Sequence, residues 1–349
     1  MAGKLVKGGL GVAGVLLLVG GGAFAWGTSA AGAVTSKVYE THRVDLPVPW
    51  PLDEAAVTEL RGAAATTATE ASAPTDPAAT AAPADPLASV DLVALANERA
   101  VARGKHLLES RYACAECHGT NLGGGTMIDD PAIGAFLGPN LTSGKGGILA
   151  DYTMADWDRA VRHGVRRDGT PLVMPSQDFV GMADQELSDI VAYLRSVPPV
   201  DNAVPAVTIG PVGTMLLATA KMVPSAEQHP DHDAAHPELP PATAANAEFG
   251  SHLAKVCTGC HRADLSGGPV IGGDPSWPAA RNLTTHEQGL KGWTYEQFVV
   301  ALEEAKRPDG TPIQKPMSDI APYAKNMSDT ELQALWAYIS ALPPVPTGS

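Results

Sequence analysis

The sequence predicts an all-α protein that contains two tandem copies of one small domain behind an N-terminal transmembrane helix. Segments with apolar residues at helical spacing follow one another in the same order twice. The only four cysteines fall in two pentapeptides of the same pattern, at 114–118 and 257–261. A stretch without charge runs from Gly8 to about Trp26, close to the ~20 residues that span a bilayer.

Residues 1–30 are predicted to be a membrane anchor. Lys4 and Lys7 precede the apolar stretch, which would hold the N-terminus in the cytoplasm and export the remainder of the chain. A cleaved signal peptide is the alternative, because Ala23-Phe24-Ala25 has the small-x-small pattern of a cleavage site. Residues 31–96 follow as an extended, low-complexity tether, polar and rich in proline at first and then dominated by alanine, threonine and proline.

The first domain is predicted over 97–200 and the second over 246–349. In each copy a helix leads into the cysteine pentapeptide, and two later helices begin at capping boxes or acidic first turns. The last helix of the first copy stops at Val197-Pro198-Pro199, and that of the second stops at Leu342-Pro343-Pro344. Asn140-Leu141-Thr142 matches Asn282-Leu283-Thr284, which supports a duplication.

Two kinds of connecting segment remain. Long loops rich in glycine and proline are expected over 119–152 and 262–293, folded against a bound group. Residues 201–245 are expected to form a linker. His229, His232 and His236 lie in that linker and are compatible with a metal site, but a solvated linker is preferred because no neighbouring sequence feature would fix the ligands.

The chain has 349 residues and a formal net charge of −14. This sign argues against a nucleic-acid partner, whose phosphates attract basic surfaces. An acidic surface would steer a basic protein partner, or it confers solubility alone.

Each pentapeptide has the pattern Cys-x-x-Cys-His, which is typical of covalent haem attachment. Cys114 and Cys117 would bond the vinyl groups of one haem, and His118 would ligate its iron. The second set is Cys257, Cys260 and His261. A redox dithiol or a zinc site is the alternative, but no βαβ pattern surrounds either motif and each cysteine pair carries its own histidine.

The sixth iron ligand is predicted to be methionine, since His/Met coordination suits electron transfer. Met174 and Met317 each lie 56 residues after the histidine of their own copy. Met182 and Met327 also correspond, but they directly precede the last helix and are interpreted as packing residues. His163 and His286 have no counterparts, and a surface position is predicted for His163.

The haem-ligating imidazoles are expected to donate their second N–H to a backbone carbonyl. Pro139 offers such a carbonyl in the first copy, and Arg281 takes that place in the second.

These residues resemble the class I cytochrome c superfamily over about 97–200 and 246–345. The resemblance rests on the haem pentapeptides, on Gly138-Pro139-Asn140-Leu141, on the later methionines and on the closing helices. The whole chain looks like membrane-anchored dihaem c-type cytochromes of bacteria, whose relatives include cytochrome subunits of alcohol and sugar dehydrogenases. The likeness implies two covalently bound haem c groups with His/Met-ligated irons, and a single-pass inner-membrane protein with periplasmic haem domains. The order Pro316-Met317 departs from Met174-Pro175, and Arg281 replaces a proline.

The function expected is electron transfer without catalysis of its own. Single electrons would pass from a donor dehydrogenase or quinol-oxidising complex to an acceptor oxidase or soluble cytochrome. The alternatives are a haem enzyme, of the dihaem peroxidase or thiosulfate-oxidising type, and the cytochrome subunit of a membrane-bound dehydrogenase.

Overall fold

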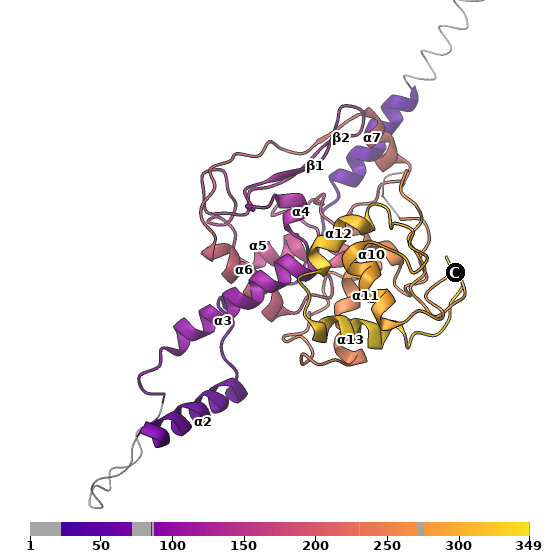
Figure 1. Ribbon diagram of the computed structural model, residues 1–349. Coiled ribbons are helices and arrows are strands. Elements are labelled where there is room, and N and C mark those ends of the chain that lie inside the picture. The colour runs from indigo at the N-terminus through magenta and orange to yellow at the C-terminus, as the bar shows by residue number, and fades with distance from the viewer. Residues whose placement is uncertain (1–21, 72–84, 86, 230, 271–275, 349) are drawn as a thin grey trace, which may run out of the picture.

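The computed structural model describes residues 22–71, 85, 87–229, 231–270 and 276–348 (Figure 1). Helix α2 (Glu54–Ala71) precedes the two predicted domains. The first domain and the segment after it contain α3 (Leu92–His106), η1 (Leu107–Arg111), α4 (Ala115–His118), β1 (Gly125–Asp130), β2 (Gly134–Gly138), α5 (Met154–Val161), η2 (Ser176–Asp178), α6 (Asp184–Ser196), β3 (Thr208–Ile209), α7 (Pro211–Ala218) and α8 (Ser225–Gln228). The second contains α9 (Ala247–Leu253), η3 (Ala254–Cys257), α10 (Thr258–His261), α11 (Tyr295–Glu304), α12 (Met317–Ala324) and α13 (Asp329–Ile339).

The predicted helix starts are confirmed. Reciprocal capping boxes join Thr153 to Asp156 at α5, Thr294 to Gln297 at α11 and Ser328 to Glu331 at α13. In each box the side chains satisfy backbone N–H groups that a helix end leaves without partners.

The same helix crossing organises both domains. Helix α3 packs across α6 in the first domain, and α9 packs across α13 in the second. A glycine sits at each crossing: Gly104 lies against the backbone carbonyl of Asp189, and Gly250 lies against that of Ala334. Buried side chains including Leu108 and Leu187 form the first core around the crossing, and the second core has Leu253 and Leu335 in the same role.

Alanine at either crossing is expected to destabilise its own domain. The added Cβ of Gly104→Ala or Gly250→Ala would fall well inside contact distance of a helix carbonyl, which can move only if the two helices separate. We expect a loss of about 1–3 kcal/mol in the free energy of unfolding, which exceeds the ~1 kcal/mol by which alanine favours a helix over glycine. Thermal unfolding followed by circular dichroism measures this. Gly62→Ala in α2, where an added Cβ meets nothing within 4 Å, is the control and should not destabilise the protein.

A small sheet distinguishes the structure from the all-α prediction. Strands β1 and β2 form an antiparallel hairpin within the predicted loop 119–152, and β3 of the predicted linker adds to the free edge of β2. The hairpin turn contains Gly134, whose φ of 134° is favourable only for glycine. A Cβ added at this position would also collide with the carbonyl of Thr208. The domains are therefore mainly helical rather than wholly so.

The predicted linker packs against the first domain. Besides β3, it supplies α7 and α8, and α8 lies against η2. The Ser225 hydroxyl at the start of α8 donates to the carbonyl of Met174. Backbone N–H groups of Asp184 and Gln185 at the start of α6 donate to the carbonyls of Pro237 and Glu238. The histidines of this segment are partly buried against the first domain.

Residues 37–50 of the predicted tether pack against the first domain instead of forming a free chain. The backbone N–H of Tyr39 donates to the carbonyl of Gly169, and the hydroxyl of Ser188 on α6 donates to the carbonyl of Pro47. Leu46 and Val48 pack on the core of the first domain, and Trp50 is buried. Proline-rich sequence here gives an extended strap that the domain surface fixes in place.

The prediction of an N-terminal transmembrane helix is wrong. Across the described residues no helix is both long and apolar enough to cross a bilayer. Residues 1–21, which hold most of the apolar stretch, lie outside the described residues. Residues 22–35 are helical but rich in glycine and alanine, and Gly27 lies against Met215 of α7. The single-pass inner-membrane location was predicted from this helix, and that prediction is wrong as well.

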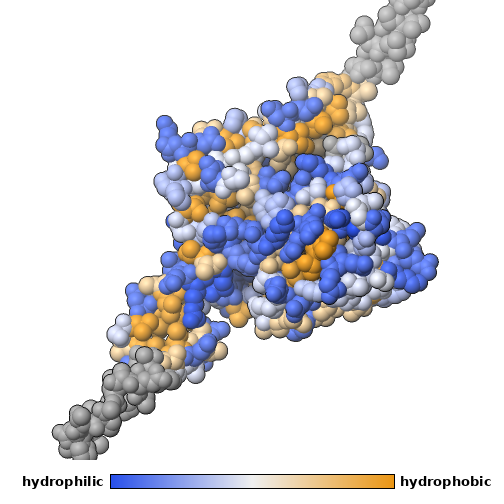
Figure 2. All heavy atoms as spheres, in the orientation of Figure 1, coloured by the Kyte–Doolittle hydropathy of each residue, from blue (hydrophilic) through white to orange (hydrophobic). Residues whose placement is uncertain are grey.

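Apolar side chains gather where this helical segment meets α7 (Figure 2). Phe24, Trp26 and Val212 are each about half exposed there.

Candidate functional site

Each cysteine pentapeptide forms a single helical turn, α4 or α10. The two cysteines of a motif are three residues apart, so their side chains project from one face of the turn. All four thiols are free, with no disulfide between them. Burial raises the pKa of the Cys114 thiol to about 12 and that of the Cys257 thiol to about 12. Two thiols side by side on one turn are the arrangement that addition to the two vinyl groups of one haem requires.

Both motif histidines are buried and oriented by a backbone carbonyl, as predicted. His118 Nδ1 lies 2.9 Å from the carbonyl oxygen of Pro139, and His261 Nδ1 lies 2.6 Å from that of Arg281. Since a carbonyl can only accept, each Nδ1 carries the proton and each Nε2 keeps a lone pair. Burial lowers the pKa of both imidazoles, against the carbonyl hydrogen bonds that raise it. A neutral imidazole with a free Nε2 is the form that binds iron.

The Asn-Leu-Thr segments hold the end of each domain to its haem loop. The side-chain amide of Asn140 donates to the carbonyl of Val200 at 2.7 Å, and that of Asn282 donates to Val345 at 2.7 Å. Each asparagine oxygen also accepts from the threonine two residues later. The sequence repeat identified these residues, but only the structure shows that each asparagine binds a carbonyl about 60 positions later in the chain.

The predicted methionines take different positions in the two domains. Met174 is partly buried and packs on the same core cluster as Cys114. Met317 is the first residue of α12 and is half-buried. Met182 is 2% exposed within the first core, and Met327 packs against the second core, as predicted for packing residues.

The haem turn of each domain lies against the methionine-bearing segment of the other domain. Helix α12, which begins with Met317, packs on η1, and Tyr323 OH lies 3.3 Å from the carboxylate of Glu116 in the first motif. In the reverse direction η2, just after Met174, packs on η3 and α10. The side chain of Asp178 there lies against the backbone of Gly259 in the second motif. The labels α4, α10 and α12 accordingly lie together at the centre of Figure 1.

The potential of the second haem is expected to fall as pH rises through about 7. Burial raises the pKa of Asp178 to about 7, against a backbone hydrogen bond from Gly259 that lowers it. Above that pH the carboxylate is charged, and its negative charge favours the oxidised state, which carries one more positive charge. The size expected is on the order of 50 mV, equivalent to a change of about one pKa unit between the two redox states. Potentiometric titration at several pH values measures it.

Asp178→Asn should hold the second potential level between pH 6 and 8 and leave the first unchanged. Asp309→Asn, at an exposed turn, is the matched control. A wild-type potential without any slope near neutral pH would contradict the coupling.

A buried ionic cluster joins the two domains beside this interface. Glu186 of α6 accepts from Arg111 at 2.5 Å and lies 2.9 Å from His252 Nε2 of α9. On the other side, His106 Nε2 lies 2.8 Å from the carboxylate of Glu331 in α13. Neither motif nor spacing pointed to these pairings, because each residue lies on a different helix.

His163 differs from its predicted surface position. Its side chain is fully buried below α5, among the histidines of the segment between the domains. His286 is half-buried, and its Nδ1 accepts from the backbone N–H of Gln288.

Comparison with known proteins supports the haem assignment. The family model for cytochrome c matches residues 101–198 and 247–343. The chain is 27% identical over 284 residues to the alcohol dehydrogenase (quinone) cytochrome c subunit of Gluconobacter oxydans, an alignment that covers 72% of this chain and 57% of that protein. It is 33% identical over 120 residues to the fructose dehydrogenase cytochrome subunit of Gluconobacter japonicus, covering 32% of this chain and 24% of that one.

A shorter match, 28% identical over 101 residues, is to a "diheme cytochrome c-type" protein of Cereibacter sphaeroides and covers 26% of this chain and 34% of that protein. The chain spans little more than half the length of the alcohol dehydrogenase subunits that it matches. The family model covers more than half of the chain in two separate regions, each with one Cys-x-x-Cys-His motif. The chain therefore belongs to the cytochrome c family, as a c-type cytochrome that carries two covalently bound haem c groups.

Proposed function

We propose that residues 97–200 and 246–349 are two haem domains that relay single electrons within a dehydrogenase complex. The thioether bonds come from Cys114 and Cys117 in the first domain and from Cys257 and Cys260 in the second. The iron ligands are His118 with Met174 and His261 with Met317. Haem iron, when bound, supplies the one-electron couple, while the chain fastens, orients and encloses it.

The residues at each motif fit this group. Free paired thiols on one face of a turn suit covalent attachment, and the carbonyl-oriented imidazoles present Nε2. Gly138 adds a second indication, because a Cβ there would collide with the carbonyl of Cys117 and press on His118. The close approach of the loop therefore depends on glycine next to the histidine.

The reciprocal contact between the domains is the main observation that supports an electron relay. Each haem turn abuts the segment that follows or contains the other domain's methionine. Both haem turns therefore lie at the interface between the domains. This arrangement suits passage of an electron between two haems fixed there.

The partner proposed is the catalytic subunit of a dehydrogenase as donor, with an acceptor oxidase or soluble cytochrome beyond it. The named relatives, which are cytochrome subunits of alcohol, fructose and gluconate dehydrogenases, support a donor of this class. The exposed apolar residues around α7 support a subunit contact, since large apolar patches on a surface mark interaction sites.

Carbon monoxide binding tests the proposal. If a histidine and a methionine of the chain hold each iron, the reduced protein should not bind carbon monoxide, and the oxidised protein should show the weak far-red band of methionine-ligated haem. Carbon monoxide binding at one haem, together with peroxide turnover, would instead indicate a haem enzyme with an open iron position.

A further inference from the structure

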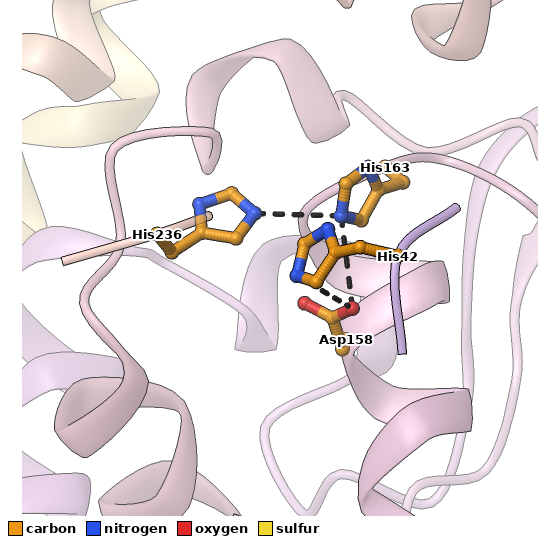
Figure 3. Close-up of side chains that lie close together, drawn as sticks. All are labelled: His42, Asp158, His163 and His236. Atoms are coloured by element: carbon orange, nitrogen blue, oxygen red, sulfur yellow. Dashed lines mark hydrogen bonds and ion pairs between the residues drawn. The ribbon is translucent and has the colours of Figure 1, made fainter. Parts of the chain in front are cut away.

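We propose that His42, Asp158, His163 and His236 form a binding site for a divalent transition metal ion, and specifically a tetrahedral zinc site. They come from the strap before the first domain, from α5, from the turn after α5 and from the segment between the domains (Figure 3). One ligand atom from each lies within 4.8 Å of the others. Sequence separation conceals this site, because its members span almost 200 positions.

Hydrogen bonds fix the tautomers of two of the imidazoles. His42 Nδ1 lies 3.2 Å from the carbonyl oxygen of His232, and His236 Nδ1 lies 3.1 Å from that of Val180. Because a carbonyl oxygen can only accept, each Nδ1 that bonds to one carries the proton, and each Nε2 offers a lone pair. Carbonyl partners of this kind orient metal-binding histidines in known sites.

The third imidazole is fixed through a chain of two hydrogen bonds. His232 Nε2 donates to the carbonyl of Ala226 at 2.9 Å, so its Nδ1 is an acceptor. His163 Nδ1 lies 3.0 Å from that acceptor and must donate to it. His163 Nε2 therefore has a free lone pair, and it faces the same centre as the other two.

The spacing of these atoms matches a cation between them. His163 Nε2 and His236 Nε2 are 3.4 Å apart, and neither carries a proton by the hydrogen bonds above. Two lone pairs facing each other repel unless a positive charge lies between them. Tetrahedral zinc with bonds of ~2.0–2.1 Å places its ligand atoms ~3.3 Å apart, close to this separation.

Asp158 supplies a negative oxygen with no other role. Its Oδ1 accepts from Arg162 Nε at 2.7 Å, but its Oδ2 is buried without a hydrogen-bond partner. Oδ2 lies 3.6 Å from His163 Nε2 and 3.9 Å from His42 Nε2. A buried unpaired carboxylate oxygen is costly unless something binds it. Arg162 is also paired with Asp184, so two carboxylates share one guanidinium and leave net negative charge for a cation.

Three imidazoles and one carboxylate suit zinc, and four ligands from the protein itself describe a closed, structural site. Such an ion would fasten both the strap and the segment between the domains to α5. A competing group of His163, His229 and His232 also lies within reach of one ion. It is the weaker candidate because His232 already uses both nitrogens, and His229 Nδ1 accepts from the backbone N–H of Asp231, which places the proton on Nε2.

Zinc content of the purified, haem-loaded protein tests the proposal. After treatment with a chelator and reloading with zinc, we expect one zinc per two haems by elemental analysis and haem assay. X-ray absorption at the zinc edge should show nitrogen and oxygen at ~2.0–2.1 Å and no sulfur. His42→Gln and His236→Gln should each weaken zinc binding by at least ~10-fold, the lower end of the loss seen even for residues that only support ligands. Unchanged haem spectra confirm that these variants fold.

His286→Gln in the second domain is the matched control and should bind zinc like the wild type. A wild-type protein that takes up no zinc, or sulfur in the zinc shell, would overturn the proposal. So would loss of binding in His229→Gln with full binding in His236→Gln, because that result assigns the ion to the competing group.

Discussion

Met174→His is expected to lower the reduction potential of the first haem by a few tenths of a volt. Methionine sulfur favours ferrous iron, and a second imidazole removes that preference. Axial ligands set haem potentials over a range of about 0.8 V, so a change of ligand outweighs any nearby single charge. An optically followed redox titration should show one wave displaced and one unchanged, together with partial loss of the far-red band.

Met182 provides the matched control in the same domain. It lies eight positions later and is buried in the core, so Met182→Leu conserves volume and should leave both potentials unchanged. If Met174→His leaves the first potential and the far-red band as they were, Met174 is not the ligand.

The corresponding change in the second domain separates the two sites. Met317→His should displace the other wave, with Met327→Leu as its control. Met317 begins α12 directly after Pro316, whereas Met174 precedes Pro175 in a loop without helix. The proline therefore follows the proposed methionine ligand in the first domain and precedes it in the second. This difference predicts unequal potentials for the two haems of the wild-type protein.

The sequence predicted the parts of the site that depend on local geometry. A Cys-x-x-Cys-His turn fixes its own three side chains, and the carbonyl partners Pro139 and Arg281 lie within about 20 residues of their histidines. Capping boxes are likewise local, and all three named here are present. Comparison of the two copies also predicted Met174 and Met317 as ligands, because their equal spacing from the motif histidines is visible in the sequence.

Features that depend on distant pairing could not be predicted. Strand β3 joins β2 across some 70 residues, and two residues of pairing leave no pattern in the sequence. His163 looked like a surface residue because the groups that bury it come from 42 and from 229–236. The segment between the domains looked like a linker for the same reason: its histidines, β3 and α8 make contacts that only the folded first domain offers.

Glu186→Ala is expected to cost about 3–5 kcal/mol, the largest loss of stability among the changes considered. It would leave the Arg111 guanidinium, whose side chain is 5% exposed, without its closest carboxylate, and an uncompensated buried charge costs this much. Glu331 lies 4.0 Å from Arg111 and already binds His106, so it replaces Glu186 poorly. Because Glu186 also binds His252 of the second domain, the contact between the domains should loosen.

Unfolding of the haem-loaded protein, followed by circular dichroism and by haem absorbance, measures this loss. Arg111→Met combined with Glu186→Leu is the control. Removing both charges in favour of apolar groups should recover most of the stability, since replacement of a whole buried pair is often neutral. A double variant as unstable as Glu186→Ala would mean that Glu186 acts through His252 and through the backbone N–H of Ala183 before α6, which donates to its carboxylate, instead of through Arg111.

The pH dependence gives an independent check on the same residue. Burial raises the pKa of Glu186, but the hydrogen bond from His252 and the charge of Arg111 outweigh it and bring the pKa to about 2. A folded-state pKa below the ordinary value of 4.5 stabilises the protein above pH ~4.5, and that contribution disappears as pH falls toward 2. The shift corresponds to on the order of 3 kcal/mol. Glu186→Gln should therefore be less stable than the wild type at pH 7 and should lose less stability between pH 4.5 and 2, so that the two curves converge in acid. Parallel curves across that window would show that Glu186 does not titrate with folding.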